Sequence, residues 1–178
     1  MDNSEPVDDS ALRPSHDRID ISGLFKFKRL TELTVNFAEG LWITSEEARQ
    51  LPKAWPNIET LRLDLVNRRV PRIDYKDLLN IVYSHRSLRY LSLPFDATKV
   101  EGAERDLCPG NGIIPALIEL DVGYSPISSA SRVIQLFTVH CPKLKKVESQ
   151  ADESDYQYQG QWEIVDEHFR SQGDTAST

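Results

Sequence analysis

The residue types best suited to chemistry stand together at His140 and Cys141. A histidine and a cysteine can ligate a metal ion, or the imidazole can activate the thiol as a nucleophile. Both uses need the two side chains to converge on one atom, whereas adjacent residues at the end of a helix point in different directions. We therefore expect the pair to mark a helix end, and a thiol-dependent enzyme centred on Cys141 is kept only as an alternative.

Other candidates for catalysis or metal binding are dispersed along the chain. No two histidines are spaced i, i+4, and there is no G-x-S-x-G, no glycine-rich phosphate loop and no H-E-x-x-H. One run of carboxylates, Asp152, Glu153 and Asp155, is typical of a solvated segment rather than of a cation site. The sequence therefore predicts a non-enzymatic protein with no catalytic residues, no metal and no cofactor.

Composition narrows the class of partner. The formal net charge of −7 argues against nucleic acid, which normally requires a basic surface to displace counterions from phosphates. The densest basic patch, Arg68, Arg69 and Arg72, fits a solvated loop. With 178 residues, 39% of them hydrophobic and 28% charged, the chain fits one soluble domain with a continuous core. An unidentified protein is the expected partner.

Cysteine content and hydropathy indicate the compartment. Two cysteines, Cys108 and Cys141, are too few for a disulfide framework and fit free thiols in a reducing environment. The N-terminus lacks the basic and apolar regions of a signal peptide, and no apolar run approaches the roughly 20 residues that span a bilayer. We expect a cytoplasmic or nuclear protein that does not contact a membrane.

A recurring apolar pattern predicts the elements that position the polar residues. In WPNIETLRLDL, Ile58 is followed by Leu61 and Leu63, three and five places later. The same spacing recurs at Leu30/Leu33/Val35, Leu88/Leu91/Leu93 and Leu117/Leu120/Val122, and imperfectly at Leu144/Val147. The first residues of these sets lie 28, 30, 29 and 27 positions apart. This period matches the upper end of leucine-rich repeats, about 20–29 residues, and such units must stack to bury their apolar faces.

Helical patterns separate these predicted strands. Capping-box spacing of Thr44 and Glu47 predicts a helix start, and Pro52 shortens or bends that helix. A second helix has Asp74 as a candidate N-cap, and a third apolar stripe covers residues 130–141. A last helical pattern, with Trp162, Val165 and Phe169 on one face, is placed to cap the end of the stack.

The remaining segments set the predicted boundaries. Residues 1–18 are polar and acidic and predict a disordered tail, residues 19–171 form the repeat domain, and residues 172–178 form a second disordered tail. Residues 94–115 have no helical stripe and contain a proline–glycine cluster. Two interpretations of this loop stay open, a functional segment or a plain irregularity of one repeat.

Residues that alternate with these apolar residues along the predicted strands are the candidate binding surface. Alternation along a strand directs Leu61 and Leu63 inward and their neighbours to the opposite face. The predicted partner-binding set is Glu32, Thr34, Asn36, Thr60, Arg62, Asp64, Tyr90, Ser92, Glu119, Asp121, Lys146 and Glu148. Stacked strands would bring this set onto one concave surface, which is either a recognition surface or an ordinary polar sheet face.

A family resemblance follows from the order and spacing of several segments. The segments that carry the resemblance are the recurring apolar sets, FDAT at 95–98, LDVGYSPI at 120–127, HCPKL at 140–144 and the final WEIV. Over roughly residues 19–170, the chain resembles the leucine-rich-repeat tails of fungal F-box-like proteins. The resemblance implies repeats that hold a substrate of a ubiquitin ligase, joined to an F-box that docks a Skp-type adaptor. The chain departs from the family at the F-box, because only a short polar segment precedes the repeats. An F-box starts with an LP dipeptide, but Leu51 and Pro52, the LP dipeptide of this chain, lie inside the repeats.

Together these patterns predict an α/β leucine-rich-repeat solenoid of about five repeats, with parallel strands on the concave face and helices on the convex face. The predicted function is a non-enzymatic protein-interaction module, with substrate recognition for a ubiquitin ligase as the role that the resemblance implies. The alternative is a free-standing scaffold or truncated relative with no ligase role. Adaptor binding is not expected from this chain alone.

Overall fold

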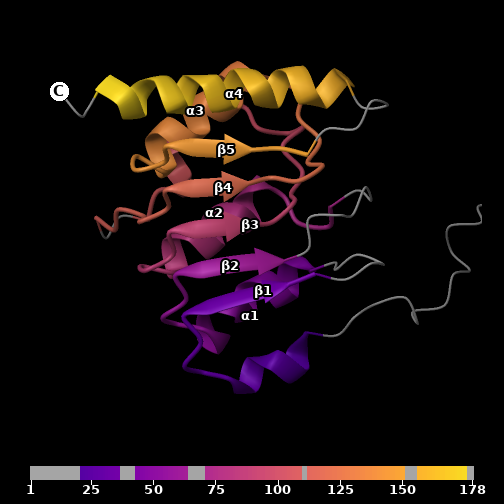
Figure 1. The fold of residues 1–178 in the computed structure, drawn as a ribbon, viewed down its shortest axis with the longest axis vertical. Coiled ribbons are helices and arrows are strands. Elements are labelled where there is room, and N and C mark those ends of the chain that lie inside the picture. The colour runs from indigo at the N-terminus through magenta and orange to yellow at the C-terminus, as the bar shows by residue number, and fades with distance from the viewer. Residues whose placement is uncertain (1–20, 37–42, 64–70, 110–111, 151–155, 176–178) are drawn as a thin grey trace, which may run out of the picture.

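The computed structural model describes residues 21–36, 43–63, 71–109, 112–150 and 156–175, drawn in colour in Figure 1. They form an α/β structure built on one parallel sheet, whose strands lie side by side in chain order (Figure 1). The strands are β1 (Glu32–Val35), β2 (Thr60–Leu63), β3 (Tyr90–Ser92), β4 (Glu119–Asp121) and β5 (Lys146–Glu148). The sheet is not curled, so the surface predicted to be concave is an open sheet face.

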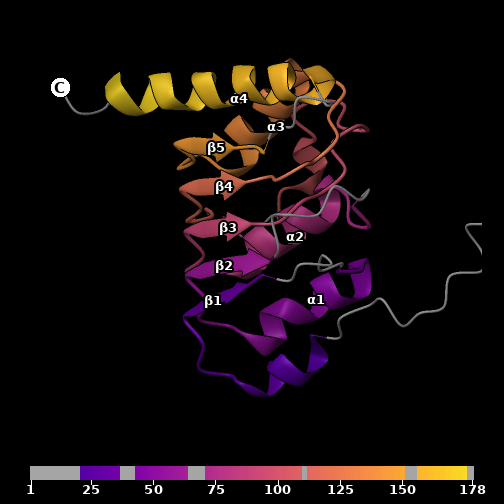
Figure 2. The ribbon, with the colours of Figure 1, turned by 45° about the vertical axis from the view of Figure 1, so that its right-hand side comes forward.

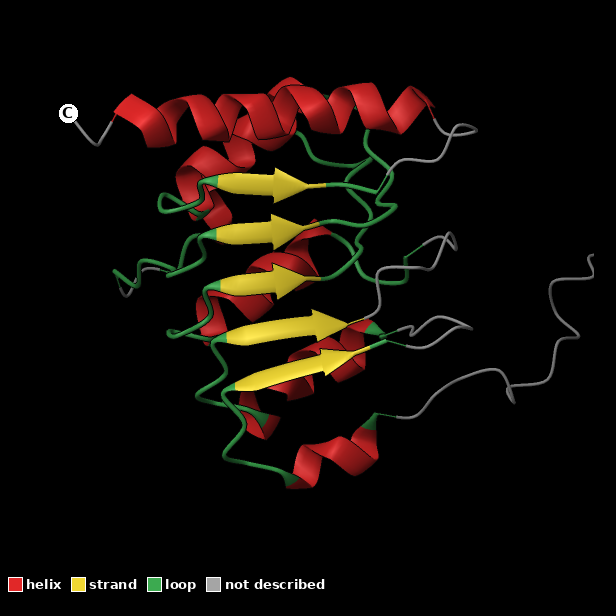
Figure 3. Cartoon of the chain, viewed as in Figure 1, coloured by secondary structure: helices red, strands yellow, loops and turns green. Residues whose placement is uncertain are grey.

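Helices cover one face of this sheet and one of its edges. Helices α1 (Ser45–Ala54), α2 (Tyr75–Ser84) and α3 (Ala130–His140) lie on the same face, while α4 (Tyr156–Thr175) runs along β5 (Figures 2 and 3). Two short 3-10 helices, η3 (Ser22–Lys26) and η4 (Arg105–Leu107), complete the described elements. Among the described residues, no helix lies over the opposite face of the sheet (Figure 3).

The core lies between the sheet and helices α1 to α3. Strand register aligns one apolar residue from each strand across the sheet, Leu33, Leu61, Leu91, Leu120 and Val147. Four of these side chains are buried, whereas Leu33 on the edge strand β1 is half-buried. The apolar spacing in the sequence thus corresponds to the row of side chains that faces the helices. The predicted α/β arrangement with parallel strands is confirmed.

Helix starts follow the capping residues that the sequence indicates. Thr44 Oγ1 accepts a hydrogen bond from the Glu47 amide, and Glu47 Oε2 accepts one from the Thr44 amide, 2.9 Å away. Asp74 accepts hydrogen bonds from the amides of the next helix's first turn. Both predicted caps are confirmed. Pro52 removes one backbone donor, and α1 ends two residues later at Ala54.

Ile21 leads directly into η3, where Phe25 packs edge-on against Trp55 with 5.3 Å between ring centroids. One predicted boundary differs from the structure. Helix α4 begins at Tyr156 and continues to Thr175, past the predicted end at residue 171. A Gln172–His168 side-chain hydrogen bond of 2.8 Å, one helical turn apart, supports this extension.

Several sequence predictions fall on residues that the structure does not describe. They are the tail 1–18, Asp64, Arg68, Arg69, the acidic run Asp152, Glu153 and Asp155, and the last three residues. In the part of the chain that is described, every helix is too short or too polar to cross a bilayer.

A buried histidine makes the stability of this core depend on pH. His85 follows α2, is fully buried, and its Nδ1 lies 2.8 Å from the Ile81 carbonyl oxygen. Burial lowers the pKa of His85 below its usual value of 6.5, and the carbonyls of Ile81 and Leu51 oppose this shift in part. Between the folded and unfolded pKa values, the unfolded chain binds more protons. As far as His85 is concerned, the free energy of unfolding is therefore at its full value above about pH 6.5, and it declines as the pH falls below that value.

We expect urea midpoints of the parent chain to fall between pH 7.5 and pH 5.5, a range that lies above the usual pKa values of carboxyl groups. A His85→Gln variant should lose this part of the pH dependence, because glutamine keeps a donor but does not titrate. Parallel pH profiles for the two proteins would show that His85 does not titrate differently on unfolding.

Candidate open-face site

The predicted outward residues form two rows across the open face. Register places Glu32, Thr60, Tyr90, Glu119 and Lys146 side by side, and next to them Thr34, Arg62, Ser92, Asp121 and Glu148. Asn36 is exposed just beyond β1, and Asp64 lies outside the described residues. The rows follow from strand alternation, because the residues between them are the apolar ones that enter the core.

Charge is distributed unevenly along these rows. At the β4–β5 end, Glu119, Asp121 and Glu148 supply three carboxylates. Lys146 is the cation at this end, and its ammonium already pairs with Glu148. The open face is therefore most acidic beside β4 and β5, while the guanidinium of Arg62 lies further along, on β2.

Asp121 is the carboxylate most affected by its surroundings. Burial raises its pKa and the neighbouring charge of Glu148 adds to this, while the Gly123 amide and the charges of Arg62 and Lys146 act in the opposite direction. The Gly123 N–H donates to Asp121 Oδ1 over 2.9 Å. A cation brought to Asp121 would favour its ionised form, so this carboxylate is suited to binding positive charge.

Ser92 is an unusual buried polar residue at the centre of the open face. Register sets it between Arg62 and Asp121, and its side chain is only 2% exposed. Among the described residues, no hydrogen-bond partner lies near its Oγ. Ser92 lines a small cavity of about 40 Å³, together with Tyr90 and Glu119. A buried hydroxyl normally has a partner, so the unsatisfied Oγ of Ser92 is an exception that sets this part of the open face apart.

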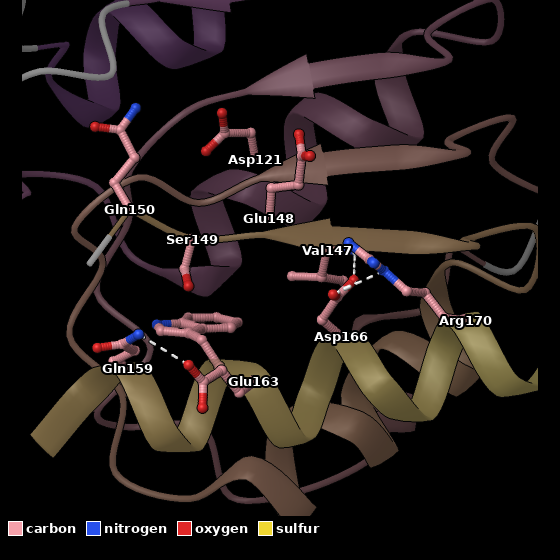
Figure 4. A pocket seen from close by; sticks show the side chains of 10 residues that line it. Asp121, Val147, Glu148, Ser149, Gln150, Gln159, Glu163, Asp166 and Arg170 are labelled. Atoms are coloured by element: carbon pink, nitrogen blue, oxygen red, sulfur yellow. Dashed lines mark hydrogen bonds and ion pairs between the residues drawn. The ribbon is translucent and has the colours of Figure 1, made fainter. Parts of the chain in front are cut away.

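A larger cavity of about 360 Å³ lies between the open face and α4 (Figure 4). Its lining residues are Asp121, Val147, Glu148, Ser149, Gln150, Gln159, Trp162, Glu163, Asp166 and Arg170. Sequence reasoning missed the contribution of α4. The available signal was the polar stripe Gln159, Glu163, Asp166 and Arg170, which has helical spacing and lies beside the apolar stripe of Trp162, Val165 and Phe169.

Three side chains of α4 hold the helix beside this cavity through hydrogen bonds to backbone groups that are distant in the sequence. Asp166 Oδ1 accepts a hydrogen bond from the Val147 amide over 3.0 Å, so it satisfies a donor on β5. Trp162 Nε1 donates to the Ser125 carbonyl over 2.8 Å, and Gln161 Oε1 accepts from the first amide of α3 over 2.7 Å. Helix α4 therefore covers the β5 edge of the sheet and holds the cavity wall in place.

His140 and Cys141 mark a helix end, as predicted, because α3 ends at His140 and Cys141 is its C-cap. Cys141 is buried, which raises the pKa of its thiol to about 12 and makes it a poor nucleophile at neutral pH. His140 contacts Cys108 instead, with 3.7 Å between Nδ1 and Sγ. Its Nε2 lies 2.9 Å from the Ala103 carbonyl and must donate to it, so Nδ1 accepts from the Tyr83 hydroxyl, also at 2.9 Å.

This arrangement occupies both nitrogens of His140. Tyr83 and Cys108 both lie within hydrogen-bonding distance of Nδ1, and the Tyr83 hydroxyl also reaches Cys108 Sγ, over 3.7 Å. The contacts of His140 join α2 and α3 to the loop at 94–115, through Tyr83 and the Ala103 carbonyl. In that role the cluster holds the described part of the loop against the helices. Across the described ranges, no three histidine, cysteine or acidic side chains are grouped to hold a metal ion.

Comparisons with known protein families, curated proteins and solved structures found no match for this chain. The resemblance described from the sequence therefore stays a prediction.

Proposed function

We propose that this chain is a leucine-rich-repeat solenoid that binds a partner protein through the open face of its sheet. The observation that carries the proposal is the pair of continuous polar rows on the face that no described helix covers. The apolar spacing of 27 to 30 residues and the chain-order sheet support the repeat architecture. Stacked repeats use such strand faces for extended binding.

This proposal has two versions, which differ in the identity of the bound partner. In the first, which the family resemblance supports, the bound protein is a substrate of a ubiquitin ligase. In the second, the chain is a scaffold with no ligase role. A pull-down with purified Skp-type adaptor bears on the first, because we expect the open face to hold substrate and the chain alone to leave the adaptor unbound. Stoichiometric adaptor binding would contradict that division of roles.

Charge-reversal variants test the use of the open face. The double variant Arg62→Glu, Glu119→Lys changes both rows, and the matched double variant Arg132→Glu, Glu46→Lys makes the same changes on exposed positions of α3 and α1. Each protein is used for affinity purification from the native source, with quantitative mass spectrometry. We expect partners of the parent chain to be retained by the helix-face variant and reduced about tenfold or more by the open-face variant.

Thermal melts check that both double variants remain folded. Equal loss of partners in the two variants, or loss only in the helix-face variant, would show that the open face is not the binding surface. Retention of every partner by both variants would contradict the proposal as well, since like charges placed at an interface disfavour association strongly.

A further inference from the structure

We propose that the partner segment is basic and extended, and that one of its lysine or arginine side chains enters the acidic end of the open face between β3 and α4. The inference rests on the proposed function and names the chemistry of the partner. Its evidence is the charge that lines two adjoining cavities, together with the buried hydroxyl of Ser92.

Negative charge dominates the lining of both cavities. Five carboxylates line them, from Glu119, Asp121, Glu148, Glu163 and Asp166, against two guanidinium groups, from Arg62 and Arg170. Two of the carboxylates already pair with cations, Asp166 with Arg170 over 2.8 Å and Glu148 with Lys146. The other three, from Glu119, Asp121 and Glu163, still outnumber the guanidinium of Arg62. The excess of carboxylates attracts a cation and repels an anion.

The two cavities adjoin one another. Asp121 and Glu148 line both of them, so a ligand that crosses these two carboxylates reaches from β3 to α4. Figure 4 shows Asp121 and Glu148 on the sheet side and Glu163 and Asp166 on the α4 side, with the cavity between them. A side chain inserted there is flanked by carboxylates from two elements.

Ser92 is the independent sign that a ligand group binds beside these acids. Ser92 is 2% exposed, and its buried hydroxyl has no partner among the described residues, on the outward side of β3 and in the wall of the smaller cavity. A hydroxyl oxygen accepts hydrogen bonds from ammonium or guanidinium donors, and those groups carry no acceptor. Ser92 Oγ and the carboxylate of Asp121 therefore form an acceptor pair for one cationic head group.

Aromatic residues complement this chemistry. Trp162 lines the larger cavity and Tyr90 the smaller one. Aromatic faces attract lysine and arginine cations, and they also contact the aliphatic stem of either side chain. Trp162 is almost fully buried, so the half-buried ring of Tyr90, which has the Arg89 guanidinium 6.0 Å from its centroid, is the aromatic surface that such a stem can contact.

The size of the sheet face favours an extended segment. Five strands at a spacing of about 4.8 Å make rows about 19 Å long, which an extended chain covers with about six residues. A second copy of this chain is disfavoured as the occupant, because each copy carries a net charge of −7. A metal ion is disfavoured by the lack of a suitable ligand group among the described residues.

An NMR titration of the full chain tests the inference. The probe is hexalysine with both ends capped, added to isotopically labelled protein at low and at physiological salt, with capped hexaglutamate as the opposite-charge control. We expect hexalysine to shift the amide signals of Ser92, Asp121, Glu148 and Glu163, and hexaglutamate to leave them in place. The absence of hexalysine-induced shifts at these four amides overturns the inference.

Single variants separate this site from general attraction to an acidic protein. Asp121→Asn and Ser92→Ala should each weaken hexalysine binding about fivefold or more. Glu167→Gln removes the same charge from an exposed position of α4 that lines neither cavity, and it should change the affinity less than twofold. An equal loss in Glu167→Gln and Asp121→Asn would overturn the inference, because the attraction would then be nonspecific. Dispersed amide spectra of each variant check that it is folded.

Failure here is distinguishable from failure of the proposed function. If hexalysine does not bind but partner capture still depends on Arg62 and Glu119, the basic-segment inference is wrong and the interaction module stands. If capture is also independent of those residues, the open face is not a binding surface.

Discussion

Replacing Trp162 with alanine is expected to lower the free energy of unfolding by about 3–5 kcal/mol, the usual cost of truncating a large buried aromatic side chain. The indole is 2% exposed and meets Phe95 edge-on, with 6.1 Å between ring centroids. Its Nε1 also donates to the Ser125 carbonyl, which would lose this partner in the variant. Urea denaturation followed by circular dichroism measures the change.

A matched control for Trp162 lies two residues along the same helix. Ile164 is 51% exposed, so Ile164→Ala should change the free energy of unfolding by no more than about 0.5 kcal/mol. Comparable losses for Trp162→Ala and Ile164→Ala would mean that α4 is not held against the sheet through its apolar stripe.

Leu91→Ala should destabilise the chain by about 2–5 kcal/mol. Leu91 is 2% exposed on the central strand β3, between Leu61 and Leu120 in the register, so its removal leaves a cavity that neighbouring strands cannot easily close. The control is Leu33→Ala, the same change at the corresponding position of the edge strand β1, where the side chain is half-buried.

We expect Leu33→Ala to cost clearly less than Leu91→Ala in the same urea titration, because part of the Leu33 side chain already contacts water. Equal losses, or a larger loss at Leu33, would contradict the strand register and the position of the core between the sheet and its helices.

Much of the architecture was predictable because its signals are local. Alternation along each strand identified Leu61 and Leu91 as core residues, and capping residues Thr44 and Asp74 marked two helix starts. The regular spacing of the recurring apolar sets then indicated parallel strands in chain order. The lack of curling of the sheet was not predictable in this way, since curvature depends on how whole units pack rather than on any single pattern.

The candidate site was only partly predictable, for the same physical reason. Outward strand positions follow from alternation, so the rows that contain Arg62 and Asp121 were identified in advance, although their binding role stays a prediction. The wall supplied by Glu163 and Asp166 was missed, because polar residues at helical spacing look like a solvated face until the helix is placed. Likewise His140 contacts Cys108, 32 residues away, rather than its sequence neighbour.

Site-specific photo-crosslinking tests the central claim, that the open face binds a partner protein, most directly. A photoreactive phenylalanine analogue replaces Tyr90 in the middle of the open face, and in a second protein it replaces Gln50 on the exposed surface of α1. After irradiation in extracts of the native source, we predict a discrete protein adduct from position 90 and none from position 50. Adducts from position 50 alone, or equally from both positions, would contradict the account.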